Sequence, residues 1–264
     1  MDGRPWLDAW LAEEPDSPDA LTVAAERQVV EAWNARSSRR AVDVDEDRWR
    51  AFRIKLDEAT PVVRAAVEAN ETDPIPWMSA VTLATGYGAS RDEFERVVQG
   101  FMHVDPANVH CHGRALNFLM PRWYGQPGEA PAYGDWAADL GGPASRLQLL
   151  PLKCEFEHLV IEPPEEVPFD SVLRERRTGV HRAIDRAEAW LTTQAEHDHV
   201  GARTARSYLA LMHHFVGHHG RAFAHFVQMG PDATRYPWAF YGEPLDRLVT
   251  IRRQITAKYA KTLG

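Results

Sequence analysis

Cysteine is scarce in this sequence, and long apolar runs are missing. Only Cys111 and Cys154 occur among 264 residues, too few for a fold built on disulfides. No run approaches the roughly 18 apolar residues that a membrane-spanning helix needs. The first residues also lack the basic stretch and apolar run of a secretory signal. We therefore expect a cytoplasmic protein with both thiols reduced and no membrane partner.

Sequence fingerprints of common enzymes are absent as well. The chain contains no Gly-x-x-x-x-Gly-Lys-Ser/Thr loop, no Gly-x-Ser-x-Gly turn and no His-Glu-x-x-His motif. Cys111 lies just inside a predicted helix, where a helix N-terminus lowers a thiol pKa, but the sequence shows no second catalytic group beside it. The formal net charge of -8 repels phosphate backbones. We expect no nucleic-acid partner, assign no catalytic residue and predict no cofactor.

Strand signals are nearly absent, whereas helical periodicity runs through the chain. Apolar or small residues recur every three or four positions over 21–33, as on one buried face of a helix. Ser90 and Glu93 have the spacing of a capping box, which marks a helix start. Thr60-Pro61 predicts a break between two helices, because proline disrupts a helix interior. The overall pattern predicts an all-α fold.

Clusters of glycine and proline predict two larger interruptions. Residues 125–143 are rich in both and predict a loop with one short helix near 136–140. A second proline-rich break covers 162–169, and a long amphipathic helix is expected over 171–193. We predict a single helical-repeat domain over residues 1–264 with these two loop interruptions.

The sequence repeats itself at about the length of a helical hairpin. Asp73-Pro74 and Asp105-Pro106 lie 32 residues apart, close to the period of about 34 in the tetratricopeptide repeat. Proline suits a helix start, because the amide hydrogen it lacks has no intrahelical acceptor there. A second copy of this hairpin repeat lies near the end of the chain and ends at Gly230-Pro231. We predict an irregular stack of helical hairpins, a tetratricopeptide-like α-solenoid.

Several short motifs resemble those of a group of bacterial tetratricopeptide-like proteins of unassigned function. The shared motifs are Asp-Pro-x-Pro-Trp, Asp-Pro-x-Asn, Leu-x-Pro-Arg/Lys-Trp-x-Gly and a terminal Pro-Trp near an aromatic-Gly-x-Pro. The resemblance implies the helical-repeat fold and implies no substrate. In this sequence the motifs lie at residues 73–77, 105–108, 119–125, 237–238 and 241–244.

Histidine supplies the main alternative to a pure binding function. Twelve histidines are present, most of them in clusters. His214 and His218 have the i, i+4 spacing of a helical metal-binding pair, but Gly217 and Gly220 predict that the helix ends there. We therefore expect exposed or hydrogen-bonded histidines at hairpin ends and assign no metal ligand. The alternative hypothesis is a metal- or cofactor-dependent all-helical enzyme that uses these clusters.

One segment combines hydrogen-bond donors with aromatic rings. Such a mixture suits recognition of a carboxylate or an acidic partner in a groove. We predict an adaptor that binds a protein or peptide in a groove formed by the first helices of successive hairpins. The predicted partner-binding residues are Trp77, His112, Arg114, Asn117, Arg122, Trp123 and Tyr124.

Overall fold

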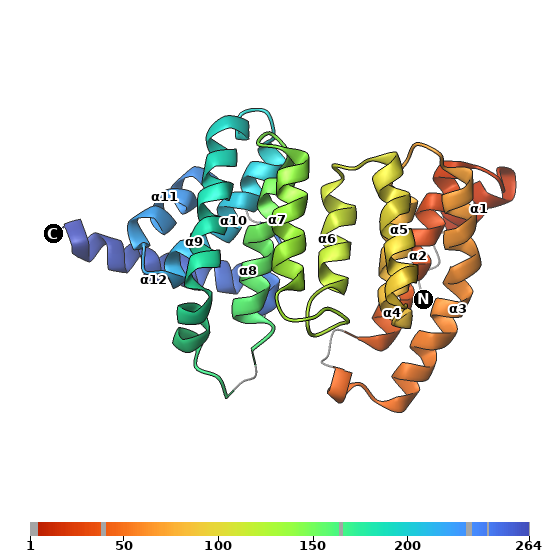
Figure 1. The fold of residues 1–264 in the computed structure, drawn as a ribbon, viewed down its shortest axis with the longest axis horizontal. Helices are drawn as coiled ribbons and strands as arrows, with labels where there is room; N and C mark the ends of the chain where they lie inside the picture. Colours follow the sequence, from red (N-terminus) through yellow and green to blue (C-terminus); the bar gives the residue numbers. More distant parts are fainter. Residues whose placement is uncertain (1–4, 38–40, 164–165, 231–233, 242, 264) are drawn as a thin grey trace. The chain divides into compact units, whose positions relative to one another are not determined.

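In the computed structural model, all regular elements of the described residues are helices, which confirms the all-α prediction. None of the helices in the described ranges combines the length and the apolar character that crossing a bilayer requires. Contacts divide the chain into two compact units, Met1–Gly125 and Gln126–Gly264, whose helices are labelled in Figure 1. The single domain over 1–264 stays a prediction. The structure describes residues 5–37, 41–163, 166–230, 234–241 and 243–263.

Unit 1 consists of helices that pack mainly on their neighbours along the chain. Helix α2 packs along α3, and α4 packs against α2, α3, α5 and α6. Apolar side chains of α2 and α3 fill the space between these helices, with α4 residues against them. The elements are α1 (Pro5–Glu13), α2 (Pro18–Arg36), η1 (Ala41–Asp43), α3 (Glu46–Ala69), α4 (Ile75–Tyr87), α5 (Arg91–Val104) and α6 (Val109–Phe118).

Unit 2 is organised around its longest helix, α9, which packs against α8 and α10 (Figure 1). Helix α10 in turn packs against α11. The main core cluster of this unit draws apolar side chains from α8 through α12. The elements are α7 (Glu129–Gly141), η2 (Arg146–Leu149), α8 (Leu150–Val160), α9 (Phe169–Gln194), α10 (His199–Phe215), α11 (His219–Met229), η3 (Trp238–Tyr241) and α12 (Pro244–Leu263).

Helix starts follow the local sequence closely in unit 1. The Ser90 hydroxyl accepts a hydrogen bond from the Glu93 amide, and the Glu93 carboxylate accepts one from the Ser90 amide at 2.8 Å, which confirms the capping box. The two Asp-Pro steps also share a local role. The Asp73 carboxylate accepts from the Ile75 amide at 2.9 Å, and the Asp105 carboxylate accepts from the amide two residues on at 3.1 Å.

The predicted break at Thr60-Pro61 is wrong. Helix α3 runs without interruption from Glu46 to Ala69, with Pro61 inside it. An interior proline removes one backbone hydrogen bond and costs about 3 kcal/mol. Buried residues of α3 on both sides of Pro61, among them Leu56 and Val63, pack within unit 1. This tertiary packing outweighs the local cost.

The segment 125–143 holds a longer helix than the one expected at 136–140. Helix α7 begins at Glu129, so Pro131 is its third residue. A proline in the first turn breaks no intrahelical hydrogen bond, because the amide groups there have no acceptor within the helix. At the second interruption, α8 ends at Val160 and α9 begins at Phe169. Pro231 and Gly242, which belong to the predicted repeat and to the family resemblance, lie outside the described residues.

Candidate metal centre

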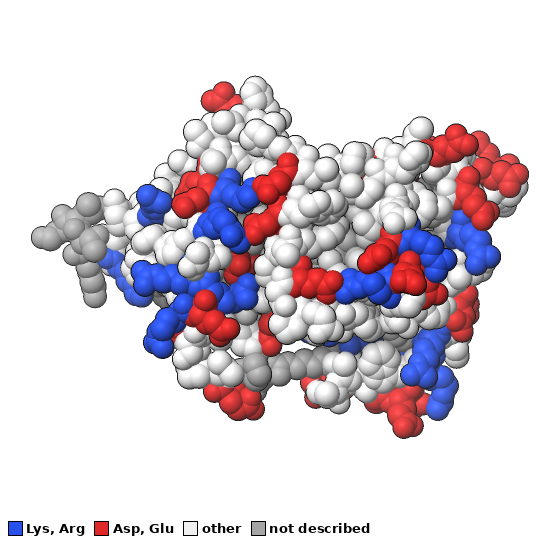
Figure 2. All heavy atoms as spheres, in the orientation of Figure 1, with Lys and Arg blue, Asp and Glu red and all other residues white. Residues whose placement is uncertain are grey.

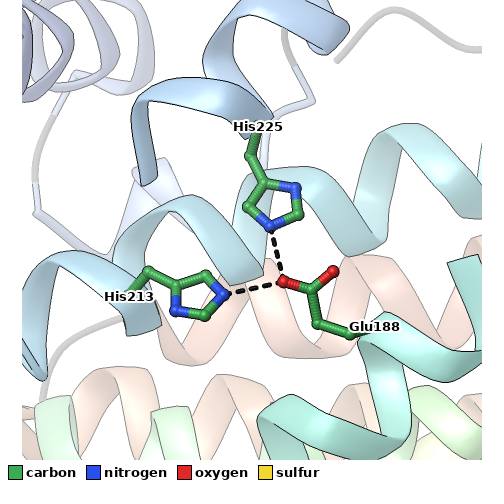
Figure 3. Close-up of side chains that lie close together, drawn as sticks. All are labelled: Glu188, His213 and His225. Carbon is green, nitrogen blue, oxygen red and sulfur yellow. Dashed lines mark hydrogen bonds and ion pairs between the residues drawn. The ribbon is translucent and has the colours of Figure 1, made fainter. Parts of the chain in front are cut away.

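Three side chains from three helices of unit 2 converge on one point. Glu188 comes from α9, His213 from α10 and His225 from α11. Both imidazoles point at the same oxygen: Nε2 of His213 lies 2.8 Å from Oε1 of Glu188, and Nε2 of His225 lies 3.0 Å from it (Figure 3). The ligand atoms of the three residues all lie within 4.8 Å of one another.

The α10–α11 hairpin brings the two histidines together. Helix α10 ends at Phe215, and Gly217 follows with a φ of 81°, a left-handed conformation that glycine adopts without the steric cost other residues incur. The chain reverses there, so that the ring of His213 stacks on the ring of His225 with centroids 5.4 Å apart and planes 11° from parallel. Helix α9 packs against α10 and supplies the carboxylate.

Burial differs between the ligand atoms of this site. His213 is fully buried, and His225 is 6% exposed. The Glu188 side chain is 34% exposed, so it is the most exposed of the three side chains. Hydrogen bonds from His213 and His225 stabilise the ionised carboxylate and lower the pKa of Glu188. The Glu188 carboxylate therefore stays ionised at neutral pH.

Two imidazoles and one carboxylate form a donor set suited to a transition metal. Zinc binds histidine nitrogen and carboxylate oxygen at about 2.0–2.2 Å, and two histidines with one glutamate occur in catalytic zinc sites. Tetrahedral geometry at those bond lengths places ligand atoms about 3.3 Å apart. The present nitrogen-to-oxygen distances of 2.8 and 3.0 Å are close to that value, and all the ligand atoms lie within 4.8 Å of one another. The residues therefore fit a metal ion and leave a coordination position open.

The Nδ1 atoms of His213 and His225 affect how tightly this site is expected to bind a metal ion. A metal-bound imidazole usually donates its second N–H to a carboxylate, a carbonyl or water. Nδ1 of His213 and Nδ1 of His225 are both buried and have no hydrogen-bond partner within the described part of the chain. Loss of such an outer partner typically weakens metal binding about 10- to 100-fold. We therefore expect an affinity below that of fully supported zinc sites.

Two further histidines connect the centre with the surface. The rings of His213 and His218 have centroids 5.7 Å apart, and those of His218 and His181 are 5.9 Å apart. His218 is exposed, in the turn between α10 and α11. His181 and Glu188 are seven residues apart on α9 and therefore lie on the same helix face. His218 therefore contacts both His213 of the centre and His181 of α9.

The sequence did not predict this group. The helix ends between His214 and His218, as predicted. The residues that converge instead are 25 and 12 positions apart in the sequence, so no short motif contains two of them. The tight glycine turn at Gly217 was the available signal, because it implies a hairpin with facing histidines.

The predicted partner-binding residues of unit 1 separate into interior and surface positions. Gly100 faces Trp77 so closely that a Cβ at Gly100 would lie 2.1 Å from the indole, which places Trp77 in a helix-to-helix contact. His112 is fully buried and pairs through Nε2 with the Pro106 carbonyl at 2.9 Å, and burial lowers its pKa. Arg114 and Asn117 are half-buried on α6.

The remaining predicted residues form one turn at the end of unit 1. Arg122 and Tyr124 are exposed, whereas Trp123 is half-buried. The indole of Trp123 packs edge-on against Trp33 with centroids 5.4 Å apart, and the Arg36 guanidinium lies over its ring. The structure therefore brings Trp123 and Tyr124 into an aromatic cluster that the sequence did not predict.

The Cys111 thiol is not activated by its helix. Cys111 is fully buried, and its Sγ donates to the Pro74 carbonyl at 3.3 Å. Burial raises the pKa of this thiol to about 12, because a thiolate loses more solvation than the helix N-terminus returns. Burial therefore outweighs the lowering effect of a helix N-terminus at this position.

No family model, curated protein or solved structure matches this chain. The relationship to tetratricopeptide-like proteins stays an expectation, and the geometry of the metal centre is the basis for the function proposed below.

Proposed function

We propose that unit 2 binds a divalent transition-metal ion at Glu188, His213 and His225 and holds it for chemistry at an open coordination position. The observation that carries this proposal is the convergence of two buried imidazoles on one carboxylate oxygen. Three protein ligands are typical of catalytic metal sites, whereas structural zinc sites usually have four. A water molecule or a substrate group takes the remaining position.

The ligand set also selects the class of metal. Imidazole suits zinc, iron, nickel and copper, while magnesium and calcium prefer sites made of oxygen ligands. Two of the three donors here are imidazole nitrogens, so zinc and iron(II) are the proposed ions. The buried free thiols Cys111 and Cys154 fit a reducing compartment, and we place this function in the cytoplasm.

Metal titration of tag-free protein tests the proposal directly. We expect one equivalent of zinc, or of cobalt(II) as a spectroscopic probe, to bind per chain in calorimetry. Glu188→Gln keeps the size and hydrogen-bonding capacity of the side chain but removes the anionic ligand, and it should weaken binding at least about tenfold. Glu175→Gln, at an exposed position of the same helix, is the matched control and should bind like the wild type.

Two outcomes contradict the proposal. The first is less than about a tenth of an equivalent of bound metal in the wild type. The second is equal affinity in wild type and Glu188→Gln, because the metal then binds elsewhere. Either result assigns Glu188, His213 and His225 to a hydrogen-bonded core group. Circular dichroism of each variant establishes that it is folded.

We propose a second function, partner binding, for unit 1. Hairpins that pack on their neighbours, such as α4 with α5, support a tetratricopeptide-like stack that serves as an adaptor for a protein or peptide. The favouring observation is the turn at Arg122 and Tyr124, where a 40% exposed tyrosine adjoins the Trp33 and Trp123 cluster. Aromatic residues and arginine are the side chains most enriched in binding hot spots.

Affinity capture from the native cell, quantified by mass spectrometry, tests this second proposal. The comparison is between the wild type and Arg122→Ala/Tyr124→Ala, with Arg50→Ala, at an exposed position of α3, as control. We expect one partner to be depleted in the double variant alone. Capture of the same proteins by all three chains argues against an adaptor function of this turn.

A further inference from the structure

A row of imidazole rings in unit 2 leads from the surface to the metal centre. The ring centroids of His181 and His218 lie 5.9 Å apart, and those of His218 and His213 lie 5.7 Å apart. The next step, from His213 to His225, is 5.4 Å. His218 is exposed and His181 is half-buried, whereas the other two histidines are buried. The row therefore joins an accessible pair of imidazoles to the buried ligands of the centre.

The spacing of these rings is close to that of two imidazoles bound to one metal ion. Metal-to-nitrogen bonds of about 2.0–2.1 Å in tetrahedral geometry place two ring centres about 5 Å apart. The inner pair, His213 and His225, has nearly this spacing, and both of its Nε2 atoms point at Glu188. The outer pair, His181 and His218, is only slightly wider, so it too has the spacing to hold an ion between its rings.

His213 has a second nitrogen that an arriving ion can use. The ionised Glu188 carboxylate only accepts hydrogen bonds, so Nε2 of His213 carries the hydrogen of the 2.8 Å contact between them. In the neutral ring the lone pair then lies on Nδ1. That Nδ1 atom is buried and has no hydrogen-bond partner in the part of the chain that the structure describes. His213 therefore offers a nitrogen donor before Glu188 releases its hydrogen bond.

The distribution of charge favours movement of a cation from the outer pair toward Glu188. Arg177 and Arg221 lie near enough to His218 to act on it electrostatically, so they repel a cation held there and weaken its binding.

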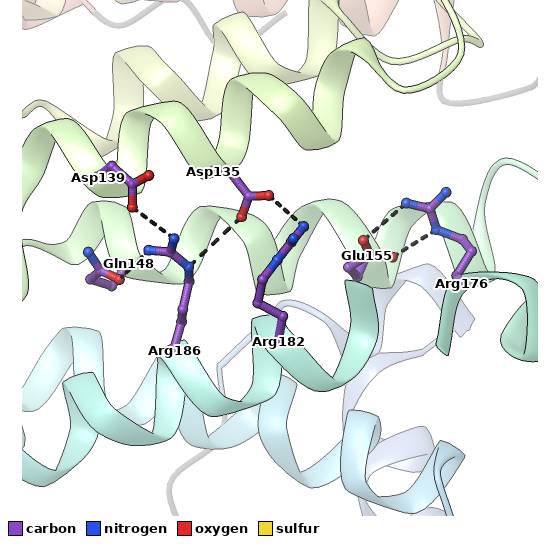
Figure 4. Close-up of polar contacts among 7 residues, drawn as sticks. All are labelled: Asp135, Asp139, Gln148, Glu155, Arg176, Arg182 and Arg186. Carbon is purple, nitrogen blue, oxygen red and sulfur yellow. Dashed lines mark hydrogen bonds and ion pairs between the residues drawn. The ribbon is translucent and has the colours of Figure 1, made fainter. Parts of the chain in front are cut away.

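Glu188 differs from the carboxylates that α7 and α8 present to α9. Those carboxylates are neutralised by arginines of α9, and Figure 2 shows basic and acidic groups side by side over this helix. The pairs are Arg176–Glu155, Arg182–Asp135 and Arg186–Asp139 (Figure 4). Glu188 is held by two imidazoles instead, so its charge stays available to attract a metal cation.

We infer that His181 and His218 form an outer binding pair that captures a divalent transition-metal ion and passes it through His213 to the metal centre. The inference rests on the metal-binding function proposed above. At each step the ion keeps one imidazole while the next nitrogen replaces another ligand, and the displaced water returns to solvent. When the ion reaches Nε2 of His213, the ring hydrogen ends on Nδ1, so the ring stays neutral.

Rates of cobalt(II) loading test this path separately from the affinity of the centre. Cobalt(II) alone is the probe, and stopped-flow absorbance follows its binding to wild type and to His181→Asn/His218→Asn. A path changes the rates in both directions and leaves the equilibrium unchanged. We therefore expect cobalt(II) binding, and its removal by a chelator, each to slow at least about tenfold while Kd stays within about threefold.

The matched control is His197→Asn, which changes an exposed histidine between α9 and α10 and should leave both rates unchanged. Circular dichroism establishes that each variant is folded. If the double variant is not folded, His218→Asn alone replaces it, because this residue lies in an exposed turn.

The outcomes separate the path from the metal centre. Equal rates in the double variant and the wild type overturn the inference and leave the centre in place. Slower loading with a matching loss of affinity also overturns it, because His181 and His218 then act as ligands or supports of the centre. Failure of cobalt(II) to bind the wild type contradicts the metal centre itself, and the path with it.

Discussion

The two units bury different kinds of side chains. In unit 1 the interior is dominated by rings and small apolar groups, as where Phe94 and Phe118 stack with centroids 4.0 Å apart. Unit 2 buries ionisable groups among its apolar residues: Glu155 is 4% exposed, Glu157 2%, and His213 is fully buried. Both units reach a packed core, but among the described residues the buried carboxylates, Glu155 and Glu157, belong to unit 2.

This difference indicates where chemistry can occur. A buried ionisable group is costly unless it is paired and hydrogen-bonded, so each such group in unit 2 has a partner. Glu155 receives two hydrogen bonds from Arg176 at 2.7 and 3.1 Å, and Glu188 receives those of two histidines. Clusters of this kind are frequent at functional sites. This agrees with the proposals of a metal centre in unit 2 and of partner binding in unit 1.

Breaking the Glu155–Arg176 pair should give the largest effect on stability. Arg176→Met leaves the Glu155 carboxylate buried without its partner, beside Gly179, where a Cβ would lie 2.4 Å from a carboxylate oxygen. Removal of one member of a buried pair costs about 3–5 kcal/mol. Urea unfolding followed by far-ultraviolet circular dichroism measures the loss.

The matched control for this prediction is Arg182→Met on the same helix. Arg182 is 55% exposed and pairs with Asp135, and exposed ion pairs contribute at most about 1 kcal/mol. Glu155→Met/Arg176→Met should recover much of the loss, because both charges are gone. Equal losses in Arg176→Met and Arg182→Met show that unit 2 does not depend on its buried charges.

An intermediate effect is expected from Gly100→Ala in unit 1. The new methyl group overlaps the indole of Trp77, whose nearest atom lies 2.1 Å from the Cβ position. Overpacking of this kind costs about 1–3 kcal/mol, more than the gain of about 1 kcal/mol that alanine brings to a helix interior. Thermal unfolding measures the change. In the Trp77→Leu background, Gly100→Ala should change the stability very little. A loss as large as that in the wild type rules out contact with the Trp77 ring as the cause of the destabilisation.

The smallest effect should come from protonation of His112. Burial lowers the pKa of this imidazole below 6.5 in the folded protein, whereas the unfolded chain binds a proton near pH 6.5. The contribution of neutral His112 to the free energy of unfolding is therefore complete above about pH 6.5. It falls as the pH drops from about 6.5 toward the folded-state pKa, by at most about 1.4 kcal/mol per pH unit.

Urea unfolding of unit 1, followed by tryptophan fluorescence at pH 7.5 and 5.5, measures this slope in wild type and variants. His112→Asn should reduce the loss of stability between the two pH values. His110→Asn changes an exposed neighbour and should leave the loss as it is. A loss that is the same in all three proteins assigns the acid sensitivity to ionisable groups other than His112.

The sequence by itself determined the helical class and many helix starts. The capping box at Ser90 and the turns at Asp73 and Asp105 involve atoms within three residues of one another, so their hydrogen bonds form wherever the chain carries those residues. The glycine turn after α10 belongs to the same class, because it depends on backbone conformation at one position.

Only the tertiary structure decided what local rules left open or predicted wrongly. Pro61 lies inside a helix because burial of α3 outweighs the lost hydrogen bond, and the pKa of the Cys111 thiol is raised because burial outweighs the helix N-terminus. The metal centre depends on how α9, α10 and α11 pack together. Contacts among residues so far apart in sequence arise from the packing of helix faces, and a single sequence does not specify which faces meet.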